Sequence, residues 1–198
     1  MIAIIDYGMG NLKNVHKALQ SIEVESIITA DPKVIGQSEK VILPGVGAFK
    51  DAIHTINASG LREVIDESAY SGKPFLGICL GMQLLFENSY ENGSYKGLGY
   101  IPGDIVKLEV PLKVPHMGWN TLEIVKQEPI FEGVPNNSYA YFVHSYHMEG
   151  AEGMISAYTT YGKRFGVAVQ KDNIYGAQFH PEKSSTVGLQ MLKNFASL

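Results

Sequence analysis

The chain contains a single cysteine, Cys79, within the segment GICLGMQ at residues 77–83. A thiolate is a nucleophile, and a cysteine with glycines two residues before and after it is typical of a nucleophile elbow. In such an elbow the nucleophile occupies a sharp, often strained turn between a strand and a helix, and the small neighbours let the two elements approach. Gly77 and Gly81 hold those positions. The pattern favours a reactive Cys79 over an inert buried cysteine.

The segment FHPEK offers a base for this thiol. His180 and Glu182 are two residues apart and so point to the same side of an extended chain, which Pro181 keeps extended. Glu182 can then accept a hydrogen bond from one imidazole nitrogen and leave the other for the thiol. Alone, this pair is more typical of a surface loop. Together with the elbow, it predicts a triad of Cys79, His180 and Glu182.

A glycine-rich segment, LPGVGAF at 43–49, can supply backbone amides to a developing negative charge. It ends another predicted parallel strand, so it lies at the sheet edge of the elbow. The amides of Val46 or Gly47, with that of Leu80, are candidate oxyanion donors, each contributing about 3–4 kcal/mol of transition-state stabilisation. A plain strand-to-helix turn explains these glycines equally well. Gln83, one helical turn after the cysteine, would contact a polar substrate unless it faces solvent.

The composition is that of a globular enzyme. Hydrophobic residues make up 45% and charged residues 18% of the 198 residues, and the net charge is −4. This charge does not favour nucleic acid or an anionic membrane as a partner. One cysteine cannot form an internal disulfide, and the N-terminal MIAIIDYG has no features of a signal peptide. We therefore expect a cytoplasmic protein.

No cofactor or metal ion is expected. The segment GMGN at 8–11 lacks the third glycine of a dinucleotide-binding loop and indicates an ordinary strand-to-helix turn. His144 and His147 are too few for a metal site, which needs three or four ligands.

The first half of the chain alternates short apolar segments with helix-like ones. Strands are predicted at 2–6, 25–29, 40–45 and 73–78, and helices near 12–19, 48–58, 61–70 and 80–88. This alternation predicts an α/β fold with a mainly parallel sheet covered by helices on both faces.

The second half consists mostly of closely spaced strand candidates. They lie at 100–109, 121–126, 139–146, 154–161, 164–170 and 174–180, before a helix at 186–197 that Ser184 or Ser185 could cap. No linker or repeat separates the halves, so we expect one domain over residues 1–198.

Three motifs together resemble the class I, or triad, glutamine amidotransferases. PGVGAF, GICLGMQLLF and GAQFHPEKS match that family's oxyanion strand, nucleophile elbow and His-x-Glu segment, in the same order. The resemblance implies a flavodoxin-like sheet and a glutaminase in which Cys79 forms a γ-glutamyl thioester. It also implies that four positions hold the glutamine: Gly47, Gln83, Ser145 and Tyr146.

Within that family the resemblance is closest to the glutaminase subunit of a two-subunit synthase of histidine biosynthesis. DYGMGNL, PHMGWN and YFVHSY are the motifs that carry it. It implies a heterodimer in which ammonia passes to a separate (β/α)8 cyclase subunit. The positions that match the docking face are Asn11, Asn14, Met117, Trp119, Tyr141 and Lys183. Asn14 departs from the serine that many relatives carry.

Two alternatives remain open at the level of sequence. One is the glutaminase subunit of another synthase, such as those for pyridoxal phosphate or anthranilate, although these lack PHMGWN. The other is a non-catalytic cysteine sensor with the same kind of elbow, which would not need the pair of His180 and Glu182.

Overall fold

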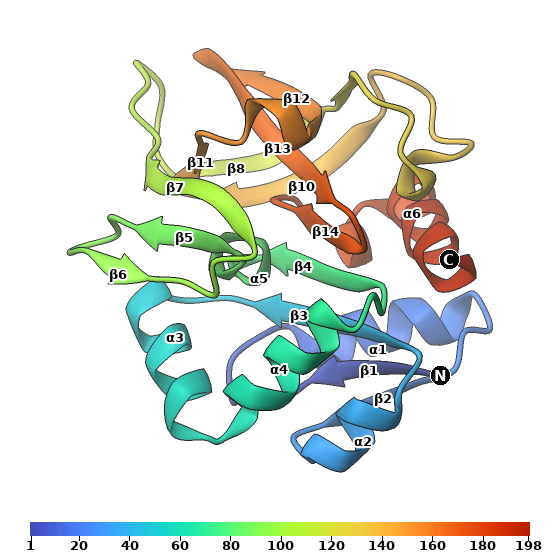
Figure 1. Ribbon diagram of the computed structural model, residues 1–198. Coiled ribbons are helices and arrows are strands. Elements are labelled where there is room, and N and C mark those ends of the chain that lie inside the picture. The colour runs from blue at the N-terminus through green and yellow to red at the C-terminus, as the bar shows by residue number, and fades with distance from the viewer.

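The structure is a computed structural model that describes residues 1–198. Its centre is an eight-stranded sheet in the order β2-β1-β3-β4-β14-β13-β12-β9 (Figure 1). The first five strands in this order run parallel, and the last three are antiparallel to their neighbours. The strands are β1 (Ile2–Ile5), β2 (Ser26–Thr29), β3 (Lys40–Gly45), β4 (Phe75–Cys79), β9 (Glu123–Ile124), β12 (Ile155–Tyr161), β13 (Lys163–Lys171) and β14 (Ile174–Ala177).

Helices cover both faces of the sheet, as the sequence predicts. They are α1 (Leu12–Ser21), α2 (Pro32–Gln37), α3 (Phe49–Ala58), α4 (Leu61–Tyr70), α5 (Leu80–Leu84) and α6 (Ser185–Ser197). Ala3 and Ile5 of β1 belong to a core cluster shared with α2, α3 and α4, whereas Ile2 and Ile4 belong to a second cluster shared with α1 and α6. Successive side chains of a strand point to opposite faces, so each strand buries apolar residues on both sides.

Two smaller sheets, formed by strands between residues 86 and 149, lie beside the central sheet (Figure 1). One has the order β11-β7-β5-β6, with β5 (Phe86–Ser89), β6 (Tyr95–Lys96), β7 (Ile101–Lys107) and β11 (Tyr146–Glu149). The other pairs β8 (His116–Thr121) with β10 (Tyr139–His144). Short 3₁₀ helices are η1 (Pro129–Phe131), η2 (Glu152–Met154) and η3 (Pro181–Lys183). The predicted α/β class, with extra strands from the second half, is confirmed.

One predicted helix is too long, and strand β8 and helix α2 are missing from the predicted elements. The helix expected at 80–88 ends at Leu84, because Phe86 pairs with Ile101 and begins strand β5. Strand β8, which contains Trp119, has no counterpart among the predicted strands. Helix α2 is absent from the predicted elements, although Asp31 accepts from the Lys33 amide at 2.9 Å as its N-cap. Short apolar segments do not distinguish helix from strand by periodicity, so the pairing partner decides.

The last helix begins where the sequence predicts, but Ser184 does not cap it through its side chain. The Ser184 hydroxyl instead donates to the His180 carbonyl at 2.6 Å and accepts from the Tyr141 amide at 3.0 Å. The serine therefore joins strand β10 to the segment that carries His180.

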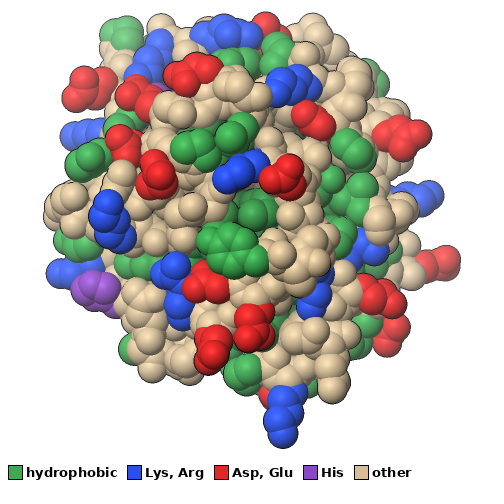
Figure 2. Space-filling model, viewed as in Figure 1, with side chains coloured by type: hydrophobic (Ala, Val, Ile, Leu, Met, Phe, Trp, Pro, Cys, Tyr) green, Lys and Arg blue, Asp and Glu red, His purple; other side chains and the backbone are tan.

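Lysine and arginine side chains are interspersed with aspartate and glutamate over the face shown in Figure 2. None of the helices is both long enough and apolar enough to span a bilayer.

Candidate active site

Cys79 is the last residue of β4, and α5 begins at the next residue. Its φ is 55° and its ψ is −113°, a strained conformation for a residue with a side chain. A Cβ on Gly81 would lie 1.8 Å from the Leu43 carbonyl oxygen, and one on Gly77 would lie 2.7 Å from the Gly81 carbonyl oxygen. Both glycines are therefore needed for the close approach of strands and helix that the elbow requires.

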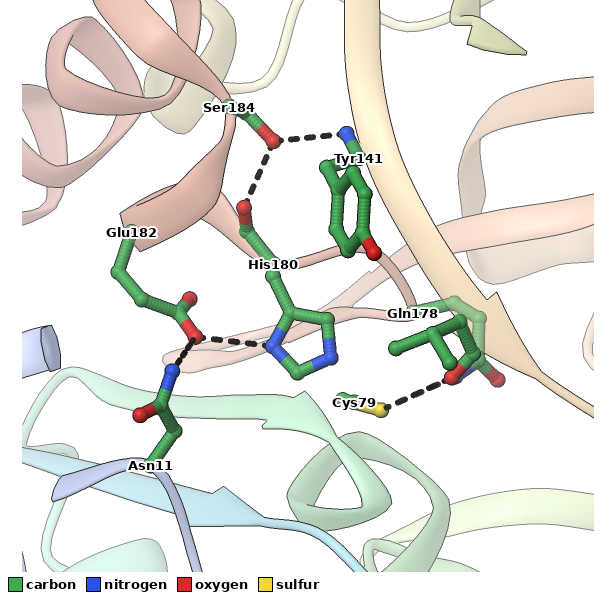
Figure 3. A network of polar contacts seen from close by, with 8 residues as sticks. Asn11, Cys79, Tyr141, Gln178, His180, Glu182 and Ser184 are labelled. Atoms are coloured by element: carbon green, nitrogen blue, oxygen red, sulfur yellow. Dashed lines mark hydrogen bonds and ion pairs between the residues drawn. The ribbon is translucent and has the colours of Figure 1, made fainter. Parts of the chain in front are cut away.

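His180 follows β14 and faces Cys79 (Figure 3). Its Nδ1 lies 2.8 Å from Glu182 Oε1, and both side chains are almost fully buried. The backbone amide of His180 donates to the Tyr141 carbonyl at 3.0 Å, which holds this segment against β10. Its Nε2 is buried without a hydrogen-bond partner on the side of the sulfur. The three residues of the predicted triad thus lie together, in the order that the chemistry requires.

The electrostatics of this group favour a protonated imidazole. Burial lowers the pKa of His180, but the neighbouring Cys79 sulfur and the Glu182 carboxylate outweigh it and raise that pKa to about 10. The proton on the ring is the one that the cysteine must lose before it attacks. His180 therefore holds a proton that it can deliver to a leaving group.

One cavity of about 300 Å³ lies in front of the sulfur. A volume of this order is at the small end of ligand pockets. Its wall contains every substrate-binding position expected from the sequence, together with two members of the triad: Val46, Gly47, Cys79, Leu80, Gln83, Ser145, Tyr146 and His180. Glu182 lies behind His180, outside the cavity wall, as an orienting group should.

The loop between β3 and α3 forms one side of the cavity. Neither the Val46 amide nor the Gly47 amide donates to another backbone group. Gly47 has a φ of +103°, a conformation that L side chains rarely adopt. Two unpaired amides in a glycine-rich loop beside a nucleophile are what an oxyanion hole requires.

A pair of buried glutamines connects the sulfur to the cavity wall. Gln178 Nε2 donates to Cys79 Sγ at 3.8 Å, and Gln178 Oε1 accepts from Gln83 Nε2 at 3.0 Å. Gln83 Nε2 also donates to the Tyr146 carbonyl at 3.3 Å. Both amide hydrogens of Gln83 are thus used, and its Oε1 remains available as an acceptor at the cavity.

Five residues of this site are not among those expected from the sequence: Glu91, Pro115, Val143 and His144 in the cavity wall, and Gln178 beside the sulfur. Gln178 is two residues before His180, so strand periodicity could have placed it on the same side. Glu91 lies in the loop after β5, lines the cavity, and accepts from the Phe49 amide at 2.6 Å. No spacing in the sequence singles out Glu91, because its place depends on how that loop packs against α3.

The expected docking residues lie on adjoining elements. Trp119 and Tyr141 are paired across β8 and β10, with ring centroids 6.0 Å apart, and the Lys183 ammonium is 5.7 Å from the centre of the Tyr141 ring. Trp119 is 53% exposed, and Met117, two residues earlier on the same side of β8, is 63% exposed. These four residues form an exposed apolar and cationic patch, which we call the β8–β10 face.

The two expected asparagines differ from each other. Asn14 is exposed on α1. The side chain of Asn11 instead turns inward, and its Nδ2 donates to Glu182 Oε1 at 3.1 Å (Figure 3). Asn11 therefore contacts the triad directly, in addition to lying near the β8–β10 face.

Known proteins resemble this chain over its full length. The family model of class-I glutamine amidotransferases matches residues 3–197. The HisH subunit of imidazole glycerol phosphate synthase from Bacillus cytotoxicus is 53% identical over 98% of this chain and 93% of its own length. The corresponding subunit from Geobacter sulfurreducens is 49% identical, over 100% of this chain and 98% of its own.

Solved structures agree in fold. A glutamine amidotransferase covers 100% of both chains with a TM-score of 0.79 and 17% identity. A chain of PurLQS from Thermotoga maritima matches 99% of this chain and 97% of its own length with a TM-score of 0.73 and 15% identity. This chain belongs to the class-I glutamine amidotransferase family and groups within it with the HisH subunits of imidazole glycerol phosphate synthase.

Proposed function

We propose that this chain is the glutaminase subunit of imidazole glycerol phosphate synthase, with Cys79, His180 and Glu182 as its catalytic triad. The observation that carries the proposal is the strained cysteine beside a buried histidine–glutamate pair, at the wall of a small cavity. The 53% identity to a subunit of that synthase identifies the reaction that the site serves. We also propose that residues 1–198 form one domain, since one sheet takes strands from both halves.

The chemistry follows from the geometry of the triad. The Cys79 sulfur attacks the γ-amide carbon of glutamine, and the oxyanion that forms is bound by the amides of Val46 or Gly47 and of Leu80. His180 gives its proton to the departing nitrogen, so the carbon–nitrogen bond breaks and ammonia leaves a γ-glutamyl thioester. Water then attacks the thioester, His180 takes its proton, and glutamate leaves as the sulfur is released.

The cavity wall offers complementary groups for the amino-acid end of glutamine. The Glu91 carboxylate and the free Gln83 Oε1 are acceptors, which suits an α-ammonium group. The segment of Ser145 and Tyr146 lies at the same wall and offers backbone groups to the substrate.

The partner in this proposal is the (β/α)8 cyclase subunit of the synthase, and it docks on the β8–β10 face. Exposed Trp and Met beside a cation are typical of an interface, where aromatic anchors contribute most of the binding energy. Ammonia passes to the cyclase, which forms imidazole glycerol phosphate and AICAR in histidine biosynthesis. Such a pathway and an unpaired thiol fit the cytoplasm, where thiols stay reduced.

A glutaminase assay tests the proposal. Glutamate release is measured for this chain alone, with the cyclase subunit, and with the cyclase and an analogue of its substrate. The expected result is weak hydrolysis alone and a large increase in the ligand-bound complex. No hydrolysis under any condition would leave a cysteine sensor as the better account. Full activity of the isolated chain would contradict dependence on the partner.

A further inference from the structure

The carbonyl oxygen of Tyr146 is held by two side chains. Gln83 Nε2 donates to it at 3.3 Å, and His144 Nδ1 lies 2.8 Å from it. A carbonyl oxygen has two lone pairs, so both bonds can exist at once. The Tyr146 carbonyl, which His144 fixes, thus helps to orient the Gln83 side-chain amide. In this orientation the Gln83 Oε1 remains available at the cavity.

His144 is the inner end of a chain of hydrogen bonds. Its Nε2 lies 2.9 Å from His116 Nδ1, and His116 Nε2 lies 3.2 Å from Asn120 Nδ2. Asn120 belongs to β8, next to the exposed Trp119. The chain therefore runs from the strand of the β8–β10 face to the wall of the glutamine cavity.

The direction of donation is set independently from each end. The side-chain oxygen of Asn120 accepts a hydrogen bond from the Thr121 backbone amide at 2.8 Å, and the Asn120 Nδ2 donates to the Thr160 carbonyl at 3.0 Å. These two bonds fix the orientation of the side-chain amide, with Nδ2 toward His116. His116 Nε2 must then accept, so His116 carries its hydrogen on Nδ1 and donates to His144 Nε2. The Tyr146 carbonyl can only accept, so His144 also carries its hydrogen on Nδ1. The Asn120 end and the Tyr146 end of the hydrogen-bond chain thus give the same direction of donation.

Both imidazoles are held rigidly in an apolar setting. His116 and His144 are 2% and 5% exposed, and the His116 ring stacks between Phe142 and Tyr161 with centroid distances of 4.8 and 4.2 Å. Burial lowers the pKa of His116 to about 4 and that of His144 to about 3. A second proton on either ring would make two hydrogen-bond donors face each other, at the contact with Asn120 or at the contact between the two rings. The hydrogen-bond chain therefore requires both imidazoles to be neutral. Neutral imidazole can accept at one end and donate at the other without a buried charge.

We propose that His144, supported by His116, is a positioning residue for glutamine binding: it fixes the Tyr146 carbonyl and thereby the Gln83 amide that faces the substrate. The inference rests on the proposed glutaminase function and deepens it. Because the triad does not touch either histidine, loss of the donor weakens the hold on glutamine more than it slows the chemical step. Cooperative polarisation along an ordered chain of donors strengthens the final bond to the carbonyl.

Two substitutions of His144 with side chains of the same branching distinguish a positioning role of this residue from a packing role. His144→Leu removes the donor, whereas His144→Asn keeps a nitrogen near the position of Nδ1 and has the same number and branching of side-chain heavy atoms as leucine. In the complex with the cyclase, His144→Leu is expected to raise the KM for glutamine about tenfold, the effect of one lost buried hydrogen bond. Its kcat should change much less, and His144→Asn should recover most of the KM. His54→Leu, on the exposed side of α3, is the control.

A second measurement uses the unaltered protein. Nitrogen-15 NMR of the imidazoles at pH 7 is expected to show both His116 and His144 as neutral rings with hydrogen on Nδ1. Hydrogen on Nε2 of either ring would overturn the proposal. Equal KM values for glutamine in His144→Leu and the wild type would also overturn it, and so would an equal rise of KM in His144→Leu and His144→Asn. If the wild-type complex itself releases no glutamate, the proposed function fails first, and the NMR result still decides the donor order.

Discussion

At the scale of single residues, the site is organised around a proton on His180. The pKa of this buried ring is about 10, above the ordinary 6.5, because the Cys79 sulfur and the Glu182 carboxylate outweigh the effect of burial. A raised folded-state pKa means that the protonated ring stabilises the fold fully below about pH 6.5, and that this contribution is lost as the pH rises through about 10. In the proposed mechanism, the same pair that stabilises the fold at neutral pH supplies the acid for the leaving ammonia.

Glu182→Gln tests this pairing. The change removes the charge that favours imidazolium, so the pKa of His180 is expected to fall toward its ordinary value and glutamine hydrolysis to slow about tenfold or more. NMR titration of His180 and steady-state rates of the cyclase complex measure the two effects. Glu152→Gln, at an exposed position in η2, is the matched control. An unchanged titration and rate in Glu182→Gln would remove this carboxylate from the triad.

The sequence allows the triad to be predicted but not the whole site. Cys79 lies in a local pattern, and His180 and Glu182 are related by strand periodicity, so short-range rules suffice for them. Glu91 and His116 reach the site only because distant segments pack together. Asn11 is expected at the docking face through the family resemblance, and its contact with Glu182 depends on how α1 meets η3. Such contacts have no local signature.

At the scale of elements, the elbow depends on how closely β3, β4 and α5 approach. A Cβ on Gly81 would lie 1.8 Å from the Leu43 carbonyl oxygen, far inside contact distance. The Leu43 carbonyl is part of the sheet and cannot move without loss of strand pairing. The positive φ of Cys79 is therefore maintained by elements on both sides of it.

Gly81→Ala is expected to destabilise the protein by about 3 kcal/mol or more, because backbone and not a flexible side chain occupies the space. Chemical denaturation measures the free energy of unfolding. Gly153→Ala, where an added Cβ meets nothing within 4 Å and no positive φ is required, should change it by less than about 0.5 kcal/mol. Equal stability of the two variants would show that the elbow tolerates a side chain at 81.

Hydrophobic periodicity predicts some of the helices and strands correctly and fails for others. The four parallel strands of the first half are predictable to within about two residues, since each is a short apolar segment that ends in turn residues. The pattern over β5 predicts helix instead, because Phe86 and its apolar neighbours fit either period and only the pairing with β7 decides. β8 escapes prediction because its residues are mostly polar and partly exposed.

At the scale of the whole molecule, hydrogen bonds connect the elements of the β8–β10 face to the residues of the proposed triad. The Tyr141 carbonyl in β10 accepts from the His180 amide, and Asn11 donates to Glu182. A partner that docks on Trp119 and Tyr141 would therefore contact the elements that hold His180, the proposed catalytic histidine. This is the physical basis for expecting that the cyclase stimulates glutamine hydrolysis.

Trp119→Ala is expected to weaken binding to the cyclase more than tenfold, as loss of a central aromatic anchor does. Tyr70→Ala is the control, because Tyr70 is 74% exposed and is the last residue of α4, a helix that lies well apart from β8 in Figure 1. Calorimetric titration of each variant with the cyclase subunit gives the dissociation constants. Equal constants for the two variants would move the interface away from the β8–β10 face.

In the proposed function, Cys79 releases ammonia from glutamine for a partner subunit that uses it. The most direct measurement compares synthesis of imidazole glycerol phosphate by the Cys79→Ala complex with glutamine and with ammonium as nitrogen source. Glutamine-dependent synthesis is expected to be abolished, while ammonium-dependent synthesis should match the wild type because the cyclase is unchanged. Continued synthesis from glutamine would rule out Cys79 as the nucleophile, and loss of both activities would contradict the division of labour between the subunits.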